Sequence, residues 1–368
     1  MGWAPHTVLR GNGKGVYDPL DAHIQAIREP TGEYTMPFGL AQVESGEIVL
    51  ICSSKVDGAE RPFVAFSADG GDTWSDFSAV PGAGGRPMML TRLGGGDLTF
   101  AANKRFFSGD CGRTWEGIEA PGALGGGMFG VEGNGYVDFD AAGRPAKLWE
   151  IGWQYEEGKS HPKDDATGIL RWSTDAGRTW DGELRPPQWK FTETYGGEQY
   201  PRGVSEGAIV RADNGWLVAA LRTDMPARYL QQPNDDSLEG TAVSISRDDG
   251  QTWSEMDLLY DAGRHHANLL RLPNGTLVIT LIVRDDVRGQ ELASHNRGCD
   301  ALVSVDSGLS WRPDRRYVLD AWPYYDPDWW YNGECGHLCS TCLDDGHILT
   351  VYGNYQRKSG VLVKWKPQ

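Results

Sequence analysis

Three side chains able to transfer protons recur at one spacing in the second half of the chain. Glu206, His266 and His337 each lie nine residues before a glycine that follows Asn or Asp. Carboxylates and imidazoles titrate in the range useful for general acid–base catalysis. Asp57, in the segment SSKVDGAER, is a further candidate acid. These residue types predict proton transfer, in which Glu206 or His337 activates water and Asp57 protonates a leaving oxygen.

Polar residues also take this spacing in the first half of the chain. Arg86 and Asn134 lie nine residues before a turn glycine, whereas Pro37 has this place at the first turn. If the strand before each turn starts at one face near a common axis, residues equally far from the turns form a ring. Buried polar groups are costly without partners, so this ring is expected to line a mouth. A solvated channel rim without chemistry is the alternative.

Arginines end the second strand of several predicted hairpins. Arg61 follows Glu60, and Arg222 and Arg284 close apolar runs further along the chain. Because second strands return to the face where first strands begin, these guanidinium groups are expected beside the ring. A guanidinium group binds a carboxylate or vicinal hydroxyl groups, and paired acids suit glycosidic cleavage. The combination predicts a sugar ligand, with a uronic or sialic acid as one option.

Six short hairpins supply the spacing. Each has a glycine turn between two apolar runs, which is a strong hairpin signal. The turn glycines are Gly46, Gly95, Gly143, Gly215, Gly275 and Gly346. Six similar hairpins predict six similar sheets.

An eight-residue motif, SxDxGxTW, follows five of these hairpins. Copies begin at Ser67, Ser108, Ser173, Ser246 and Ser304, the last with Ser in place of Thr. The Asp accepts backbone N–H groups across a tight turn, the Gly takes a positive φ, and the Trp packs under the hairpin. The motif is therefore expected to fold the chain and to do no chemistry.

These repeats predict an all-β fold, a six-bladed β-propeller of four-stranded antiparallel blades. The sixth blade has no copy of the motif, so its outer strand is expected from the N-terminal segment, around His6 to Leu9. That closure joins the ends of the ring and protects its edges. One domain then spans residues 1–368.

Five such motifs, known as Asp boxes or BNR repeats, on six blades resemble the sialidase (neuraminidase) superfamily over nearly the whole chain. The box is specific for the fold and not for one activity. The resemblance implies that Glu206 and Arg222 match the Glu and the second Arg of the sialidase site. It also implies a third Arg at Arg284 and an acid/base residue at Asp57, or at Glu60.

Two positions depart from the sialidase pattern. Where the family carries Arg-Ile-Pro, this chain has Thr-Met-Pro at positions 35–37, which leaves the first Arg to Arg28 or Arg61. Where the nucleophilic Tyr opens the last blade, this chain has His337. Tyr325 or Tyr331, in AWPYYDPDWWYNGE, is a candidate for a phenol from another position or for stacking on a sugar ring. Plain sialidase activity is therefore not expected.

Three functions remain open. The first is an exo-acting glycoside hydrolase that removes a terminal sugar, with Glu206 and Asp57 as acid/base groups and His337 in place of the Tyr. The second is a polysaccharide lyase, in which His337 or His266 removes the proton α to a uronate carboxylate and the arginines stabilise the enediolate. The third is a sugar-binding propeller without catalysis.

No cofactor is expected. Glu206, His266 and His337 would make a two-His, one-carboxylate metal set if their side chains converge, but His pairs more often hydrogen-bond than bind metal. His265 is expected on the opposite face of its strand from His266. The cysteine spacing CxxxCxxC in ECGHLCSTC is expected to fill a packed strand, because alternation turns its last thiol to the other face.

Charge and composition exclude several partners. The 368 residues carry 51 acidic and 35 basic side chains, a net charge of -16, so nucleic acid is not an expected partner. No apolar run approaches the roughly 18 residues of a membrane span. The start MGWAPHTVLRGNGKGVY shows no signal peptide, which fits a cytoplasmic protein or a trimmed secreted or periplasmic form. The expected partner is a glycan or oligosaccharide, and the oligomeric state is left open.

Overall fold

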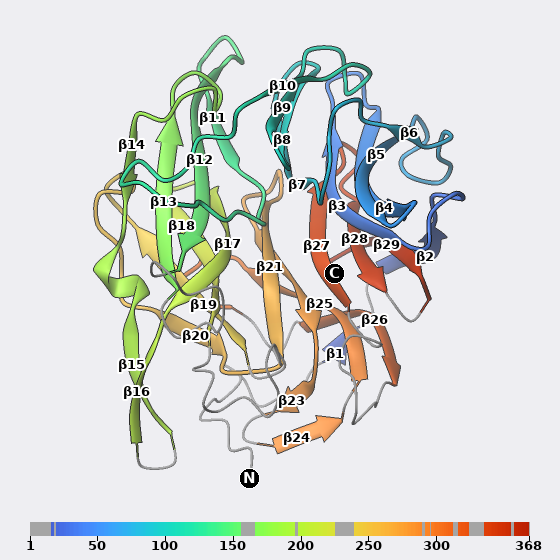
Figure 1. Ribbon diagram of the computed structural model, residues 1–368. Helices are drawn as coiled ribbons and strands as arrows, with labels where there is room; N and C mark the ends of the chain where they lie inside the picture. Colours follow the sequence, from blue (N-terminus) through green and yellow to red (C-terminus); the bar gives the residue numbers. More distant parts are fainter. Residues whose placement is uncertain are drawn as a thin grey trace.

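The chain folds as a six-bladed β-propeller of four-stranded antiparallel sheets around a central axis (Figure 1). The computed structural model describes residues 16–17, 20–155, 166–195, 198–224, 239–288, 291–294, 296–311, 316–323, 335–354 and 357–367. Within these ranges the helical structure is the three-residue 3-10 turn Pro187–Trp189. No helix in the described part of the chain is long and apolar enough to cross a membrane.

Each blade is a meander whose first strand lies nearest the axis. From inside to outside, the first blade contains β3 (Thr35–Gln42), β4 (Ile48–Val56), β5 (Ala59–Ser67) and β6 (Ser78–Ala79), and the second contains β7 (Met88–Gly94), β8 (Asp97–Ala101), β9 (Arg105–Ser108) and β10 (Glu116–Ile118). The third blade contains β11 (Tyr136–Phe139), β12 (Pro145–Gln154), β13 (Thr167–Ser173) and β14 (Gly182–Leu184), and the fourth contains β17 (Val204–Arg211), β18 (Leu217–Thr223), β19 (Gly240–Ser246) and β20 (Asp257–Tyr260). The fifth blade contains β21 (Arg264–Arg271), β22 (Leu277–Val283), β25 (Asn296–Ser304) and β26 (Arg316–Pro323), and the sixth contains β27 (Cys335–Cys342), β28 (Ile348–Asn354), β29 (Ser359–Lys366) and β2 (Leu20–Ile27).

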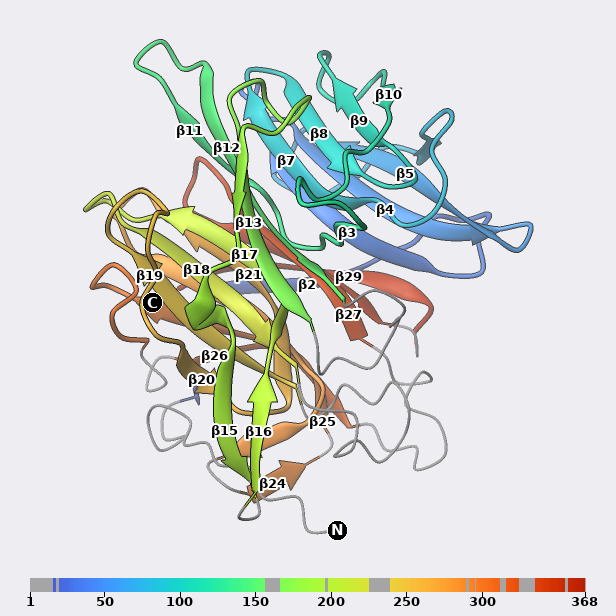
Figure 2. The same ribbon diagram turned by 60° about the vertical axis from the view of Figure 1, so that its left-hand side comes forward.

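The sixth blade takes its outer strand from the N-terminal part of the chain. β2 pairs antiparallel with β29 and β1 (Val16–Tyr17) pairs parallel with β26. The closing strand is thus residues 20–27, and the segment His6 to Leu9 lies outside the described residues. Two extra ribbons, β15 (Phe191–Tyr195) with β16 (Glu198–Arg202) and β23 (Asp286–Arg288) with β24 (Glu291–Ser294), extend on the same side of the molecule (Figures 1 and 2).

The core is divided between neighbouring blades. Six clusters of buried apolar side chains each join strands of two adjacent blades, and together they run round the ring. The cluster between the last and first blades includes Leu40, Leu50, Leu349 and Leu362, all buried. Burial of these side chains is the main contribution that holds the ring closed.

The SxDxGxTW segments form the connections from third to fourth strands. In the fourth blade, Asp248 Oδ1 accepts hydrogen bonds from Ser246 Oγ (2.9 Å) and the Thr252 N–H (2.8 Å). Gly250 has a φ of 82°, and Trp253 Nε1 donates to its carbonyl at 3.2 Å. The segment is therefore a side-chain-bonded turn. It lies at the opposite end of the blade from the start of the innermost strand, because successive strands run antiparallel.

The innermost strands share an irregularity near their first residues. The pairing register shifts by a bulge in β3, β7, β17, β21 and β27. At these bulges Met89, His266 and His337 have φ angles of 54°, 51° and 55°, which non-glycine residues rarely adopt. A bulge interrupts the alternation of side chains and re-aims one of them. In β17, β21 and β27 the re-aimed residues are Glu206, His266 and His337, which line one pocket.

Candidate active site

Glu206 lies at the centre of a buried group of charges. Arg222, sixteen residues later on β18, places Nη1 2.5 Å from Glu206 Oε1. His266, on the next blade, places Nδ1 2.7 Å from Glu206 Oε2. The Glu206 side chain is 10% exposed, so both contacts act with little screening by water. The structure therefore joins three of the residues that the repeat spacing and the strand ends predicted.

A second carboxyl group, that of Glu132, meets Glu206 from the neighbouring blade. Glu132 precedes β11 and is followed by Gly133, just as Glu206 is followed by Gly207. The two glycines touch, because a Cβ added to Gly133 would lie 1.8 Å from the Gly207 carbonyl oxygen. Close contact between the two Glu-Gly backbones thus brings the two carboxyl groups together.

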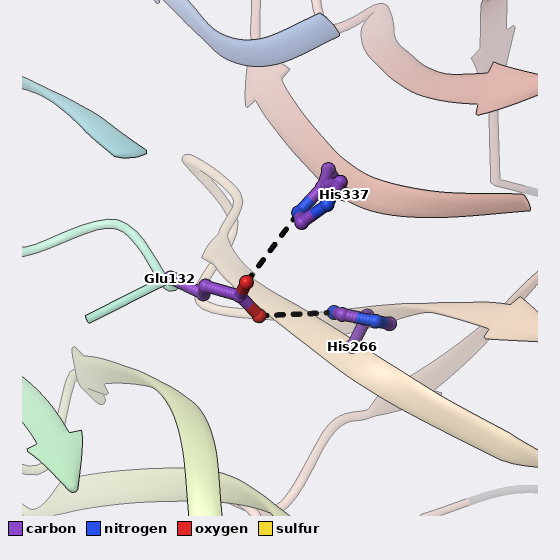
Figure 3. Close-up of side chains that lie close together, drawn as sticks. All are labelled: Glu132, His266 and His337. Carbon is purple, nitrogen blue, oxygen red and sulfur yellow. Dashed lines mark ion pairs between the residues drawn. The ribbon is translucent and has the colours of Figure 1, made fainter. Parts of the chain in front are cut away.

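The two bulge histidines face Glu132 from the opposite side of the pocket (Figure 3). Glu132 Oε2 is 3.6 Å from His266 Nδ1, and Glu132 Oε1 is 3.7 Å from His337 Nδ1. Donor atoms of these three residues all lie within 4.8 Å of one another. The sequence suggested Glu206 as the carboxylate of such a set, but Glu132 is the one that faces both imidazoles.

A polar chain from the first two blades supports His337. Arg86 Nη1 is 3.3 Å from His337 Nε2, and Arg86 Nε donates to Glu60 Oε2 at 2.9 Å. Tyr34 donates its phenol proton to Glu60 at 2.5 Å. Phe38 packs against the other side of the imidazole, with ring centroids 4.2 Å apart. His337 is therefore held by contacts on its edge and its face.

The two carboxyl groups are driven to opposite protonation states. Burial opposes ionisation of Glu206, but Arg222 and His266 outweigh it and hold its pKa well below the usual range. Burial, the charge of Glu206 and a hydrogen bond to Glu206 raise the pKa of Glu132 well above its usual range. The pair therefore loses its first proton from Glu206 and holds its second on Glu132.

The two cationic partners of the pocket differ in their surroundings. Arg222 also forms ion pairs with Glu239 and, at 3.4 Å, with Asp224. Arg284 is almost fully buried, and its charge, after burial and the charges of Arg86 and His266, helps to hold the pKa of His337 well below its usual range. His337 is therefore a neutral imidazole near neutral pH.

Other predicted site residues do not join this group. Asp57 is exposed, with a φ of 52°, at the Asp-Gly turn between β4 and β5, and Arg61 is exposed on β5. Both residue types fit a hairpin tip that faces water. Asn134 donates to Cys339 Sγ at 3.1 Å and does not line the Glu206 pocket. Tyr325 lies outside the described residues.

The strand that carries His337 departs from simple alternation. The Cys335 thiol donates to the Val283 carbonyl at 3.3 Å, whereas Cys339 Sγ accepts from the Leu40 N–H at 3.3 Å. These two thiols face different neighbours because the bulge lies between them. His265 also departs from the expectation, since its ring centroid is 4.6 Å from that of His266. The positive φ of His266 removes the opposition that a regular strand would impose.

The most important residue missed from the sequence is Glu132. Counting nine residues back from the turn of the third blade gives Asn134, but β11 begins only at Tyr136 and the preceding segment is irregular. A usable signal exists in the repeated Glu-Gly pair, in VEGNGY and SEGAIV. Two such pairs at the inner ends of adjacent blades would have indicated two facing carboxyl groups.

Replacing Gly133 with Ala is expected to separate these carboxyl groups. The new methyl group meets the Gly207 carbonyl at 1.8 Å, so the backbones must move apart. Overpacking of this kind costs about 1–3 kcal/mol of stability, and we expect a lower urea midpoint with loss of activity. Gly109→Ala is the control, because its Cβ would meet only Asp97 Oδ1 at an ordinary 3.6 Å. Equal stability of the two variants would contradict the close approach.

Solved structures with the same architecture place the fold among known propellers. No family model and no curated protein matches the chain. A crystal structure of an unknown function protein from Dyadobacter fermentans DSM 18053 superposes with a TM-score of 0.65 and 15% identity, over 95% of this chain and 99% of that one. A mutant of NanB sialidase from Streptococcus pneumoniae gives 0.57 and 12%, over 95% and 71%. The GH93 alpha-L-arabinofuranosidase of Fusarium graminearum with arabinobiose gives 0.57 and 14%, over 95% and 96%.

These similarities concern the fold. The chain shares the six-bladed propeller architecture of sialidases and of the arabinofuranosidase, as the repeats predicted. At such low identity the activity has to be argued from this chain's own residues.

Proposed function

We propose that this protein is an exo-acting glycoside hydrolase whose two reacting carboxyl groups are Glu132 and Glu206. The observation that carries the proposal is their direct meeting, from adjacent blades, in a pocket that His266 and His337 complete. Glycoside hydrolysis generally needs one carboxylic acid and one carboxylate on either side of the scissile bond. In this proposal Glu132 takes the role of the acid that the sequence suggested for Asp57.

The roles follow from the contacts of each carboxyl group. Glu206, beside Arg222 and His266, is the carboxylate that attacks the anomeric carbon while the bond to the leaving oxygen breaks. Glu132 gives its proton to that oxygen. Water then attacks the glycosyl ester on Glu206 and gives a proton back to Glu132, which releases the sugar.

The closeness of the two groups favours retention of anomeric configuration. Carboxyl groups about 5–5.5 Å apart are typical of retaining enzymes, whereas inverting enzymes leave about 6.5–9.5 Å for a water molecule. Glu132 and Glu206 are hydrogen-bonded directly and so lie closer than either separation. They must part to admit the scissile bond, and from this starting point the retaining separation needs the smaller movement. This favours double displacement over the inverting mechanism that a His337 base would suggest.

The charges around the pocket favour a neutral terminal sugar over an acidic one. Arg222 is already paired with Glu206, Glu239 and Asp224, and Arg86 with Glu60. A sugar carboxylate would enter a pocket where protein carboxylates surround these guanidinium groups. The similarity to an arabinofuranosidase supports a terminal α-L-arabinosyl group as the first substrate to test.

The test is release of monosaccharide from a panel of α-L-arabino-oligosaccharides, α-linked sialosides and uronate-containing oligosaccharides. We expect one neutral sugar to be released from the chain end, with proton NMR showing retained configuration at the anomeric carbon. An unsaturated product that absorbs in the ultraviolet would show that the reaction is elimination and not hydrolysis. Binding of a glycan without cleavage of any glycan in the panel would support a sugar-binding propeller without catalysis.

A further inference from the structure

Glu132, His266 and His337 form a donor set at the propeller axis. Each comes from a different blade, and the three side chains are 16%, 8% and 6% exposed. Their donor atoms lie within 4.8 Å of one another, with both imidazole Nδ1 atoms facing the two oxygens of one carboxylate (Figure 3). Both histidines reach this position through backbone with positive φ, a strained conformation that tends to persist where it serves a site.

We propose that Glu132, His266 and His337 bind a divalent transition-metal ion such as Zn²⁺. Two imidazoles and one carboxylate are a donor set that such ions favour over Mg²⁺ or Ca²⁺. Tetrahedral ligands at about 2.1 Å from a metal stand about 3.4 Å from one another. Glu132 Oε2 is 3.6 Å from His266 Nδ1 and Oε1 is 3.7 Å from His337 Nδ1, each close to that value. Binding through one carboxylate oxygen requires the donor atoms, now within 4.8 Å of one another, to draw together.

Metal binding requires one neighbouring side chain, that of Arg86, to move. Metal binding through His337 Nδ1 leaves the ring proton on Nε2, which faces Arg86 Nη1 at 3.3 Å. Two donors cannot share that contact, so the Arg86 head has to turn away. Its side chain is 35% exposed, which leaves it room to do so. Glu206, 2.7 Å from His266 Nδ1, offers a fourth oxygen ligand.

The metal and the sugar compete for one place. An ion held by Glu132, His266 and His337 lies beside Glu206, which is 2.7 Å from His266 Nδ1, and so occupies the space between the two reacting carboxyl groups; an occupied site is inactive. This consequence rests on the proposed function, whereas the metal site itself does not. The ion is thus a reversible inhibitor of the hydrolase and not its cofactor.

The test is titration of the purified, chelator-treated protein with Co²⁺, followed by its visible absorption bands, with elemental analysis after dialysis against Zn²⁺. We expect one equivalent of metal. His337→Gln and Glu132→Gln, which alter different blades, should each weaken binding by more than about 100-fold, since removal of a ligand exceeds the loss from an outer partner. Arg86→Met should tighten binding, because it removes a positive charge and a competing donor.

His347→Gln is the matched control, because His347 pairs with Asp345 at an exposed turn. It should bind Co²⁺ like the unaltered protein. Absence of a stoichiometric absorption band, or equal affinity in His337→Gln, would overturn the site. If one equivalent of Zn²⁺ binds but the rate of sugar release is unchanged, the proposed inhibition is wrong and the metal site is still supported. If no glycan is cleaved at all, the proposed hydrolase function is wrong, and the Co²⁺ titration still tests the metal site independently.

Discussion

Glu206→Gln is expected to lower kcat/KM for release of the terminal sugar by about 10³-fold or more, equivalent to about 4 kcal/mol of transition-state stabilisation. A neutral amide cannot form the glycosyl ester. The fold should survive, because Gln has nearly the same shape and Arg222 keeps Glu239 and Asp224 as partners. The measurement is steady-state kinetics of monosaccharide release, with circular dichroism to verify folding.

A matched control variant distinguishes the loss of the proposed nucleophile from the general effect of removing a carboxylate charge. Glu47→Gln removes a surface carboxylate that pairs with Arg113, and it should retain full activity. In the unaltered enzyme, a 2-deoxy-2-fluoro glycoside should leave its sugar on the peptide that contains Glu206, as detected by mass spectrometry. Undiminished turnover by Glu206→Gln, or labelling of a different peptide, would remove Glu206 from the nucleophile role.

The blade architecture was predictable because its signals repeat. All six turn glycines adopt positive φ, between 56° and 88°. In the last three blades the interval from the bulge to the turn is the same, so counting back from Gly215, Gly275 and Gly346 reached the residues that line the pocket. Counting back from the turn glycine finds equivalent residues only where the strand between the bulge and the turn has the same length in each blade.

The nine-residue count is less exact where the strands differ in length. In the second blade, three consecutive glycines blur the turn and the bulge residue is Met89, although Arg86, from the preceding segment, still reaches His337. In the third blade, Glu132, the carboxyl group that lines the pocket, precedes the regular strand altogether. Asp57 carries a different signal, because Asp-Gly is typical of a turn, and the structure places its side chain at the exposed tip of a hairpin.

Bulges explain why side-chain direction could not be predicted. Strict alternation put His266 and His265 on opposite faces, yet their rings are adjacent. Nothing in the residue types around His266 or His337 marks a positive φ, since glycine is the usual residue there. The convergence of the two imidazoles on Glu132 is a property of the packed ring and not of any single strand.

Glu132→Gln is expected to lower hydrolysis of a natural oligosaccharide by about 10²–10⁴-fold, the range of general acid catalysis. The loss should be far smaller for an aryl glycoside, because a phenolate with a low pKa leaves without receiving a proton. Glu206→Gln should fail on both substrates, since every substrate needs the carboxylate. The measurement is kcat/KM of both variants on an oligosaccharide and on an activated aryl glycoside of the same sugar.

Asp57→Asn decides between the two candidate acids. Asn tolerates the φ of 52° at this turn, so the variant should fold and hydrolyse both substrates normally if Glu132 is the acid. If Asp57→Asn instead shows the leaving-group-dependent loss and Glu132→Gln does not, the acid belongs to the hairpin tip and has to reach the pocket by movement of the β4–β5 turn. The contrast works because the two residues differ in burial: Asp57 faces water, whereas Glu132 meets its partner carboxylate where desolvation keeps the proton in place.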